Sequence, residues 1–401
     1  MSHLGLKENL PFLNGVYVAV NAVSDAYLVV DGPYCVIYKL DMQMAHDPGS
    51  TLMDPAGLGR VFMTDIRMNT TVVYNMATDR GHDIEQVLRK AASLPGAGVV
   101  LLTSMDFNHL LSVPLGSYRR RVAREGGAPV VQVDNESLDG DWLDGYARVL
   151  ERLAAELDLD DAAPGPDRVA VVGHLMDRNE GDQTGNVAEL ERLVRGLGLD
   201  PVSVWPSGGP VAALREARRA GSIVSLPYGR AAARILGERL AVPVIEADLP
   251  LGLAGTGRFL AVVGKSTGRE AEAGAFAESE LSRVVPAVRR HVFRYLAGRR
   301  ASVHADPVLA LALPELLREA GIETVALTVV GEPRHLDETA RAGLLAAGAR
   351  FEPVVCPTDP LGFPGGKADL VVSGSLFPGR DDEAFEWVPL GYPSYTYHPI
   401  A

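Results

Sequence analysis

Residues 167–174 read DRVAVVGH, and residues 186–199 read NVAELERLVRGLGL. The first stretch is a short run of apolar, mostly β-branched residues that ends at a glycine. The second places its apolar residues at helical spacing. A continuous Val/Ala strand followed by an amphipathic helix is typical of a parallel sheet that is covered on both faces.

The same order recurs on either side of this stretch. Strand-like runs lie at 96–104 (GAGVVLLTS) and 128–134 (APVVQVD), with a helical segment between them. Further runs lie at 299–306 (RRASVHAD) and 323–331 (ETVALTVVG), again separated by a helical segment. The sequence therefore predicts an α/β fold of three Rossmann-like domains, with parallel sheets around a central cleft.

Two stretches suggest where these domains end. Residues 158–167 (DLDDAAPGPD) are acidic and rich in Pro and Gly, which favours a linker. Residues 268–300 form one long, mostly helical connection, with Glu at its start and Arg at its end, as the helix dipole favours. We therefore expect domains at 1–163, 164–298 and 299–401, the middle one including the connecting helix.

Composition excludes several classes of protein. The net charge is −13, from 38 basic and 51 acidic residues, which argues against a nucleic-acid binder. The basic clusters at 119–124 and 289–300 are interpreted as solvated helix faces or partner contacts. No apolar run is long enough for a membrane span, and the first residues do not resemble a signal peptide. With only two Cys, a disulfide framework is excluded and a cytoplasmic location is expected.

Residues directly after strands are the first candidates for a site, because ligands of parallel sheets bind at the carboxyl ends of the strands. The candidates are Ser104, Met105, Asp106, Gly173, His174, Leu226, Pro227, His304, Asp306, Ser373 and Ser375. His109 follows one strand end closely, and His46 precedes Asp47 in a loop rich in Gly and Pro.

Common catalytic motifs are absent from the sequence. The segment GTGRFL (255–260) lacks the third glycine of a dinucleotide fingerprint. The nine His show no metal-ligand spacing, and no G-x-S-x-G elbow is present. Cys35, in DGPYC (31–35), has three interpretations: metal ligand, nucleophile or small buried apolar residue. Cys356 is interpreted as a small residue at a strand end.

Several segments, in this order, resemble the nitrogenase component 1 superfamily, whose members include nitrogenase subunits, their scaffold proteins and reductases of tetrapyrroles. The segment VVDGPYC (29–35) resembles the family's H-G-P-x-G-C, whose Cys binds an iron–sulfur cluster. LLTSMDF (101–107) resembles a strand that ends in T-S-C, and PLGLAGTGRFL (250–260) resembles P-x-G-x-x-x-T-x-x-F-L. The segments 171–209 and 298–329 resemble the openings of the second and third domains.

The resemblance implies a depleted set of cluster ligands. Cys35 corresponds to the second family cysteine, Met105 stands at the third, and the first falls near residues 6–11, where Glu8 is a polar group. A [4Fe–4S] cluster takes four ligands, normally thiolates. Three arrangements stay open: a paralogous subunit supplies the other three Cys, two copies each supply Cys35 and a carboxylate such as Glu8, or no cluster binds.

The resemblance also implies an activity. The chain would be a reductase subunit that shares an interfacial [4Fe–4S] cluster with a second copy or with a Cys-richer paralogous subunit. Electrons would come from an ATP-dependent iron protein, which alone binds ATP, and a small molecule would be reduced in the interdomain cleft. His46, Asp106, His109 and His174 would donate protons. Thr256, Arg258 and His304, with Met105 and Glu8, would contact cofactor or substrate. The alternative is a scaffold protein that binds a metallocofactor or tetrapyrrole-like ligand without redox turnover.

Overall fold

The computed structural model describes residues 11–33, 60–63, 81–105, 113–160, 163–177, 183–352, 368–373 and 386–389. Within these ranges the chain forms two compact units. One unit comprises Leu10–Gly181 and Val202–Val244, and the other comprises Met1–Asn9, Asp182–Pro201 and Ile245–Ala401. The two units hold three parallel sheets in all among the described residues, so the predicted α/β class is confirmed. The predicted domain boundaries and the central cleft stay predictions.

The first sheet has the strand order β2-β1-β3-β4. Its strands are β1 (Ala26–Asp31), β2 (Val61–Met63), β3 (Val99–Ser104) and β4 (Val130–Gln132). The adjacent pairs β1–β2, β1–β3 and β3–β4 are all parallel. Every residue of β3 is buried, which explains why its sequence is a continuous apolar run rather than an alternating one.

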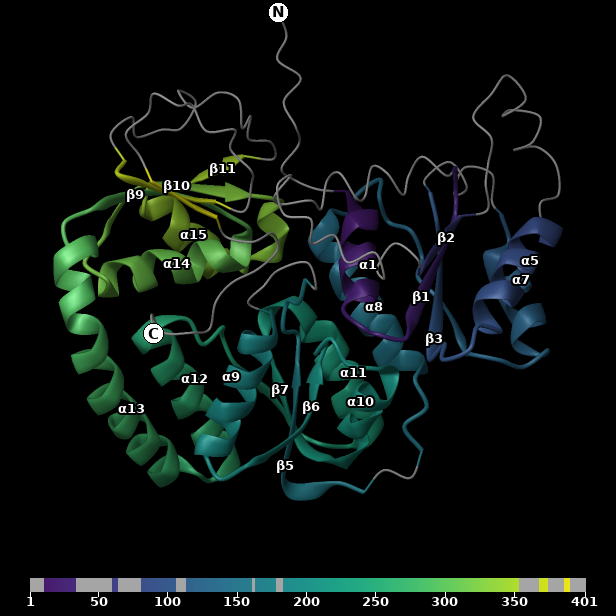
Figure 1. Ribbon diagram of the computed structural model, residues 1–401, viewed down its shortest axis with the longest axis horizontal. Helices are drawn as coiled ribbons and strands as arrows, with labels where there is room; N and C mark the ends of the chain where they lie inside the picture. Colours follow the sequence, from purple (N-terminus) through teal and green to yellow (C-terminus); the bar gives the residue numbers. More distant parts are fainter. Residues whose placement is uncertain are drawn as a thin grey trace, which may run out of the picture. The chain divides into compact units, whose positions relative to one another are not determined.

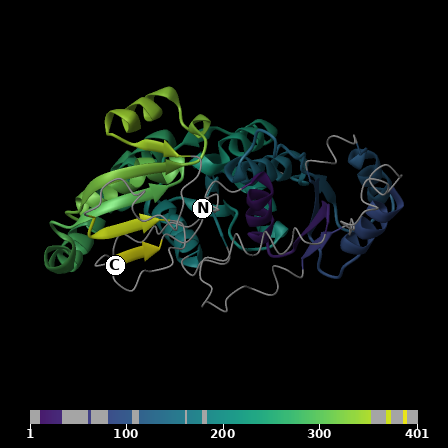
Figure 2. The same cartoon turned by 90° about the horizontal axis from the view of Figure 1, so that it is seen from above.

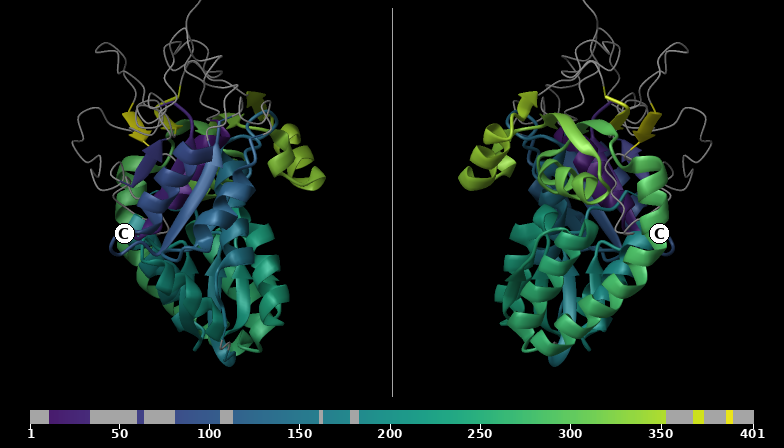
Figure 3. Two further views of the ribbon diagram at one scale, coloured as in Figure 1. Left: turned by 90° about the vertical axis from the view of Figure 1, so that its right-hand side faces the viewer. Right: turned by 90° about the vertical axis from the view of Figure 1, so that its left-hand side faces the viewer.

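Helices cover both faces of this sheet (Figure 1; Figure 3, left). On one face, α5 (Gly81–Ala92) and α7 (Leu115–Ala123) pack against alternate strand residues. Val29, Val100 and Leu102 share that core with Ile84 and Leu88 of α5. On the other side lie α1 (Phe12–Asn21) and α8 (Trp142–Glu156).

Two glycines set the close approach of α1 and α8. A Cβ at Gly15 would overlap the carbonyl oxygen of Trp142, and a Cβ at Gly145 would overlap that of Phe12. All ten residues of α1 are buried, Asn14 and Asn21 among them, so this helix is enclosed on all sides. Helix α8 begins with a capping box in which the Asp141 side chain accepts from the N–H groups of Leu143 and Asp144.

The second sheet has the order β6-β5-β7-β8. Its strands are β5 (Gly165–Val172), β6 (Asp200–Trp205), β7 (Ala220–Ser225) and β8 (Val244–Glu246). Short helices α10 (Val211–Arg215), η1 (Glu216–Arg219) and η2 (Pro227–Gly229) and the longer α11 (Arg230–Leu240) connect them. Helix α8 packs on α11 as well as on α1, so one helix joins both sheets of this unit.

The third sheet has the order β11-β10-β9-β12-β13. Its strands are β9 (Arg300–Ala305), β10 (Glu323–Val330), β11 (Arg350–Glu352), β12 (Leu370–Ser373) and β13 (Glu386–Pro389), all parallel to their neighbours. Figure 2 shows the yellow strands β12 and β13 continuing the green sheet. Helix α14 (Pro307–Glu319) packs on β9 and β10, and η4 (Pro333–His335) and α15 (Glu338–Ala346) follow β10.

Three helices complete the unit that holds the third sheet. They are α9 (Gln183–Gly196), α12 (Gly252–Thr267) and α13 (Glu270–His291), and a π-helical turn, Val292–Leu296, extends α13. Helix α12 packs against both α13 and α14. The segment GTGRFL lies inside α12, so its glycines do not form a turn between a strand and a helix. No helix in the described part of the chain is long and apolar enough to cross a membrane.

Candidate functional site

The carboxyl edge of the first sheet collects polar residues from adjacent strands. Asp31 ends β1 and Ser104 ends β3, and the two are register partners. Their exposed fractions are 0% and 4%. Because β1 and β3 are parallel neighbours, the chain segments that follow them leave the sheet at the same edge. The two segments singled out by the family resemblance, DGPYC and TSM, therefore start side by side.

Backbone and side-chain hydrogen bonds hold Met105 at this edge. Its N–H donates to the carbonyl of Asp31 at 3.2 Å. The Asn135 amide nitrogen donates to the carbonyl of Ser104 at 2.5 Å, and the Asn135 oxygen accepts from the N–H of Ser137 at 2.6 Å. Asn135 is buried and follows β4 by three residues. The sequence analysis did not include Asn135 among the candidate site residues. Its position directly after the strand-like run APVVQVD (128–134) is the signal that could have identified it.

Half of the ten predicted site residues lie outside the described residues. These are Cys35, Glu8, His46, Asp106 and His109, together with Cys356 of the third domain. The described chain stops at Pro33, two positions before Cys35, and at Met105, immediately before Asp106. The roles predicted for these residues stay predictions.

His174 follows β5, in the second sheet rather than the first. Its side chain is completely buried, and this burial lowers the pKa of the imidazole to about 3. The Tyr146 hydroxyl donates to the His174 carbonyl at 2.6 Å and accepts from the Met176 N–H at 3.0 Å. The imidazole is neutral at neutral pH, and a neutral imidazole is a poor proton donor. Proton donation by His174 would therefore require exposure of its side chain to solvent.

His304 lies within β9 of the other unit and is also buried. Its Nε2 is 3.0 Å from the Ser302 hydroxyl, and burial lowers the imidazole pKa to about 3. His304 is therefore neutral near pH 7. Asp31, Ser104 and Met105 belong to the other compact unit.

The motif PLGLAGTGRFL caps the start of α12. Gly252 has φ of +67°, and a Cβ there would lie 2.6 Å from Oε2 of Glu319. The Glu319 carboxylate accepts from the N–H groups of Leu253 at 2.6 Å and Ala254 at 2.7 Å, which satisfies two donors that a helix start leaves free. The Thr256 hydroxyl donates to the carbonyl of Pro250 at 3.0 Å. The Gly and Thr of the motif thus shape the turn that leads into the helix.

Arg258, one turn further on, forms a two-pronged ion pair with Glu315 of α14. Its Nη1 lies 3.1 Å from Oε1 and its Nη2 lies 2.5 Å from Oε2. The hydrogen bond that Arg258 donates to Glu315 raises the pKa of Arg258, and about half of the Arg258 side chain is exposed. Cofactor-binding roles for Thr256 and Arg258 stay predictions. The contacts that the structure shows for them, to Pro250 and to Glu315, lie within the protein.

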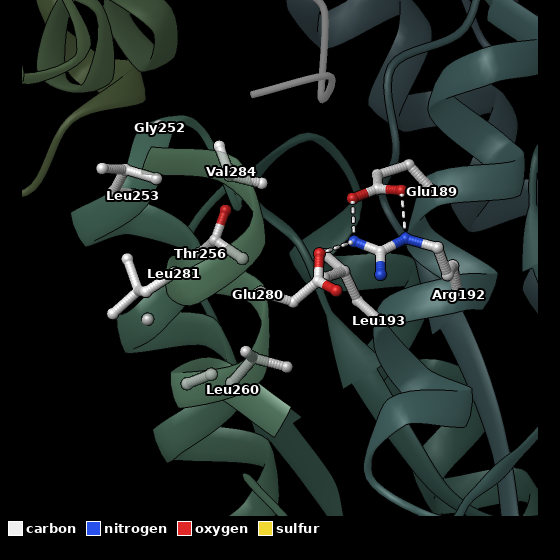
Figure 4. A pocket seen from close by; sticks show the side chains of 12 residues that line it. Glu189, Arg192, Leu193, Gly252, Leu253, Thr256, Leu260, Glu280, Leu281 and Val284 are labelled. Carbon is white, nitrogen blue, oxygen red and sulfur yellow. Dashed lines mark hydrogen bonds and ion pairs between the residues drawn. The ribbon is translucent and has the colours of Figure 1, made fainter. Parts of the chain in front are cut away.

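A pocket lies between α9, α12 and α13, and Thr256 lines it (Figure 4). Its walls are mostly apolar, with Leu193, Leu253 and Leu260 among them. At one side Arg192 donates to both Glu189 oxygens, at 2.7 and 2.8 Å, and to Glu280 at 2.8 Å.

The hydrogen bond to Glu189 is the main cause of a raised pKa at Arg192, and the bond to Glu280 adds to it. Arg192 is thus already neutralised by carboxylates. The apolar walls and this ion group favour a small apolar guest over an anion.

The donor atoms described at the sheet edge do not suit a complete [4Fe–4S] cluster. They are carboxylate, hydroxyl and amide oxygens and the thioether of Met105, whereas such clusters are normally held by four thiolates. The whole chain contains two Cys, both outside the described residues. One copy of this chain therefore lacks the thiolates for a full ligand set.

A family model for nitrogenase component 1 type oxidoreductases matches residues 12–376. The chain therefore belongs to this family, as the sequence segments predicted. The structure of nitrogenase Cp1 at pH 6.5 superimposes with a TM-score of 0.73 at 17% identity, covering 97% of this chain and 86% of that chain. At this identity the likeness shows the fold, and it agrees with the predicted nitrogenase component 1 architecture.

Curated relatives match over shorter spans. A light-independent protochlorophyllide reductase subunit of Heliobacterium modesticaldum is 28% identical over 160 residues, which is 36% of this chain and 28% of the relative. The nitrogenase molybdenum-iron protein beta chain of Methanothermobacter thermautotrophicus is 23% identical over 239 residues, or 55% of this chain and 51% of the relative. The matches thus span about a quarter to a half of the relatives' length.

Proposed function

We propose that this chain is a subunit of a nitrogenase-like reductase and contributes one thiolate, that of Cys35, to an iron–sulfur cluster shared with a second chain. The observation that carries the proposal is the edge of the first sheet, where the segment leading to Cys35 starts next to Met105. Family membership over residues 12–376 supports it. The remaining ligands would come from a Cys-richer paralogous subunit or from a second copy of this chain.

The rest of the reaction follows the resemblance. An ATP-dependent iron protein would supply the electrons, and ATP would bind to that partner only. His46, Asp106 and His109 are the proposed proton donors, since His174 is neutral and enclosed near pH 7. The substrate would be a small molecule, with tetrapyrroles as one candidate class because a relative is named a protochlorophyllide reductase. The cytoplasm is the proposed location.

The proposal is tested by iron and sulfide analysis of the full chain, purified anaerobically alone and with a candidate partner subunit. Cys35→Ser should lower iron and sulfide to background and remove the charge-transfer absorption in the visible range. Cys356→Ser is the matched control, because it removes the chain's other thiol, and it should leave iron unchanged. Absence of iron in the wild-type complex, or equal loss in both variants, would overturn the proposal.

A second candidate function is a non-redox scaffold that binds a metallocofactor or tetrapyrrole-like ligand. The observation that favours it is Met105, a thioether at the position where the family pattern has a thiol. On this alternative, Cys35→Ser keeps ligand binding intact, as measured by titration with a free porphyrin. Loss of both porphyrin binding and iron in the same variant would exclude the scaffold and support the reductase.

A further inference from the structure

The pocket between α9, α12 and α13 is a candidate for a second ligand site in this chain. All three helices belong to the compact unit that also holds the third sheet, so the walls of the pocket come from one unit. The sheet edge at which the shared cluster is proposed belongs to the other unit. The pocket therefore needs an explanation of its own.

Most of the pocket wall is apolar. Leu193 of α9, Leu260 of α12 and Val284 of α13 line it, with exposed fractions of 1%, 2% and 8%. Leu281, which also lines it, is 45% exposed, so this side chain lies where the pocket meets solvent. Walls of this kind favour a ligand whose body is apolar.

Gly257 leaves room on the α12 side of the pocket. A Cβ at Gly257 would meet no atom within 4 Å, whereas a Cβ at Gly252 would lie 2.6 Å from Glu319. Glycine inside a helix is less favourable than alanine, and no neighbour requires it at position 257. A ligand that contacts the bare backbone of α12 accounts for this glycine.

One end of the pocket is polar and offers both a donor and an acceptor. Arg192 donates to Glu189 from Nε and Nη2, and to Oε2 of Glu280 from Nη2. Its Nη1 forms no hydrogen bond with any residue that the structure describes, and Figure 4 shows no dashed line at this nitrogen. Oε1 of Glu280 likewise accepts no hydrogen bond from the described part of the chain. A hydroxyl group can accept from the first and donate to the second.

The charges at this end cancel. Glu280 accepts from Arg283 at 2.8 Å as well as from Arg192, so two guanidinium groups balance the carboxylates of Glu189 and Glu280. An anion entering the pocket would lose its water and meet the carboxylates, and a cation would lose its water and meet the guanidinium groups. An uncharged ligand avoids both costs.

We propose that this pocket binds a small uncharged molecule that has an apolar body of about one ring and a single hydroxyl group, as a phenol or benzyl alcohol has. The ring would lie against the leucine side chains and the backbone at Gly257. The hydroxyl oxygen would accept from Nη1 of Arg192, and the hydroxyl hydrogen would be donated to Oε1 of Glu280.

This site is separate from the shared cluster of the proposed function. The pocket and the residues Asp31 and Met105 belong to different compact units. Cys35→Ser should therefore leave ligand binding in the pocket unchanged, and filling the pocket should leave the iron bound through Cys35 unchanged. The two proposals can fail independently.

The test is calorimetric titration of the full-length chain with three probes that share one ring: benzyl alcohol, benzoate and benzylammonium. Benzyl alcohol should bind saturably, at one site per chain. Benzoate and benzylammonium should bind about tenfold more weakly or less, because they differ from benzyl alcohol mainly in carrying a charge.

Two substitutions fill the pocket from opposite walls. Gly257→Leu does so from α12 and Ala277→Leu from α13, and each should weaken the binding of benzyl alcohol about tenfold or more. Circular dichroism shows whether each variant is folded, and either variant alone suffices for the test. Gly274→Leu on α13 is the matched control, because Gly274 does not line the pocket and a Cβ there meets no atom within 4 Å. It should bind benzyl alcohol as the wild type does.

Four results would each overturn the proposal. They are no saturable binding of benzyl alcohol to the wild type, undiminished binding in a folded variant with a filled pocket, an equal loss in Gly274→Leu, and binding of benzoate or benzylammonium as tight as that of benzyl alcohol.

Discussion

The carbonyl of Asp31 accepts a hydrogen bond from the N–H of Met105 across two neighbouring parallel strands, at 3.2 Å. The contact ties the end of β3 to the end of β1, four residues before Cys35. Asn135 supports the same edge from β4 by donating to the carbonyl of Ser104. These hydrogen bonds hold the backbone at residue 105 in place. The proposed cluster edge needs such a fixed backbone, because a cofactor ligand must be held in position.

The first prediction concerns the replacement of the Met105 thioether by a thiol. Met105→Cys should raise the iron and sulfide retained by the anaerobically reconstituted chain, because it adds a thiolate where the family pattern has one. Met105→Leu, which keeps the size without the sulfur, should match the wild type. Iron and sulfide are measured per chain, and equal values in all three proteins would contradict the proposed cluster edge.

The second prediction concerns the crossing of α1 and α8. Gly15→Ala and Gly145→Ala each place a methyl group into the backbone of the facing helix, so each should lower the free energy of unfolding by roughly 3 kcal/mol or more. Urea unfolding followed by circular dichroism measures the effect. Gly274→Ala on α13 is the control, because nothing lies within 4 Å of a Cβ there, and it should be neutral or stabilising. Equal effects at all three positions would contradict the close approach.

The third prediction concerns the contribution of the PLGLAGTGRFL motif to stability, as distinct from any role in binding. Glu319→Gln weakens the acceptor for the Leu253 and Ala254 N–H groups and should cost about 1 kcal/mol of stability. Gly252→Ala should cost more, since it combines a strained φ of +67° with a contact at 2.6 Å to Glu319. Thermal unfolding measures both. Gly257→Ala in the same helix meets no atom within 4 Å and serves as the control.

The sheets could be predicted from sequence because their strands are buried on both faces. The run that became β3 is continuous and mostly apolar, as are the carboxyl-terminal halves of β5 and β10, and that pattern is typical of strands covered on both faces of a parallel sheet. The family resemblance could likewise be identified from the sequence alone, since it rests on the order of short segments.

Other features depend on contacts between residues far apart in the chain, and sequence patterns do not show them. The apolar residues 15–30 belong partly to helix α1 and partly to strand β1. Helix α1 is buried on every side, so it has no amphipathic period to detect. Glu319 caps α12 from 66 positions away. Buried Arg60 donates to the carbonyl of Val23 at 2.6 Å and to the Asn21 side chain at 2.7 Å, and nothing local distinguishes it from an exposed arginine.

The fourth prediction uses the two buried imidazoles. Burial lowers the pKa of both His174 and His304 to about 3, against about 6.5 in an unfolded chain. Between these values the unfolded state binds protons that the folded state does not, so stability falls as pH falls from 6.5 toward 3. Each imidazole should contribute about 1.4 kcal/mol per pH unit within that window.

The urea midpoint measured at pH 7.5, 6 and 5 tests this contribution. Carboxylates with lowered pKa values, such as Glu315, weaken the fold in the same direction but below about pH 4.5, so the interval between pH 6.5 and 5 separates the histidines from them. Glu151, whose pKa is raised by burial, acts in the opposite direction. His174→Gln with His304→Gln should flatten the slope there, even though the double variant starts from a lower stability at pH 7.5. His82→Gln replaces an exposed imidazole and serves as the control for removing a histidine as such. A double variant with the wild-type slope would show that the two side chains are protonated in the folded state.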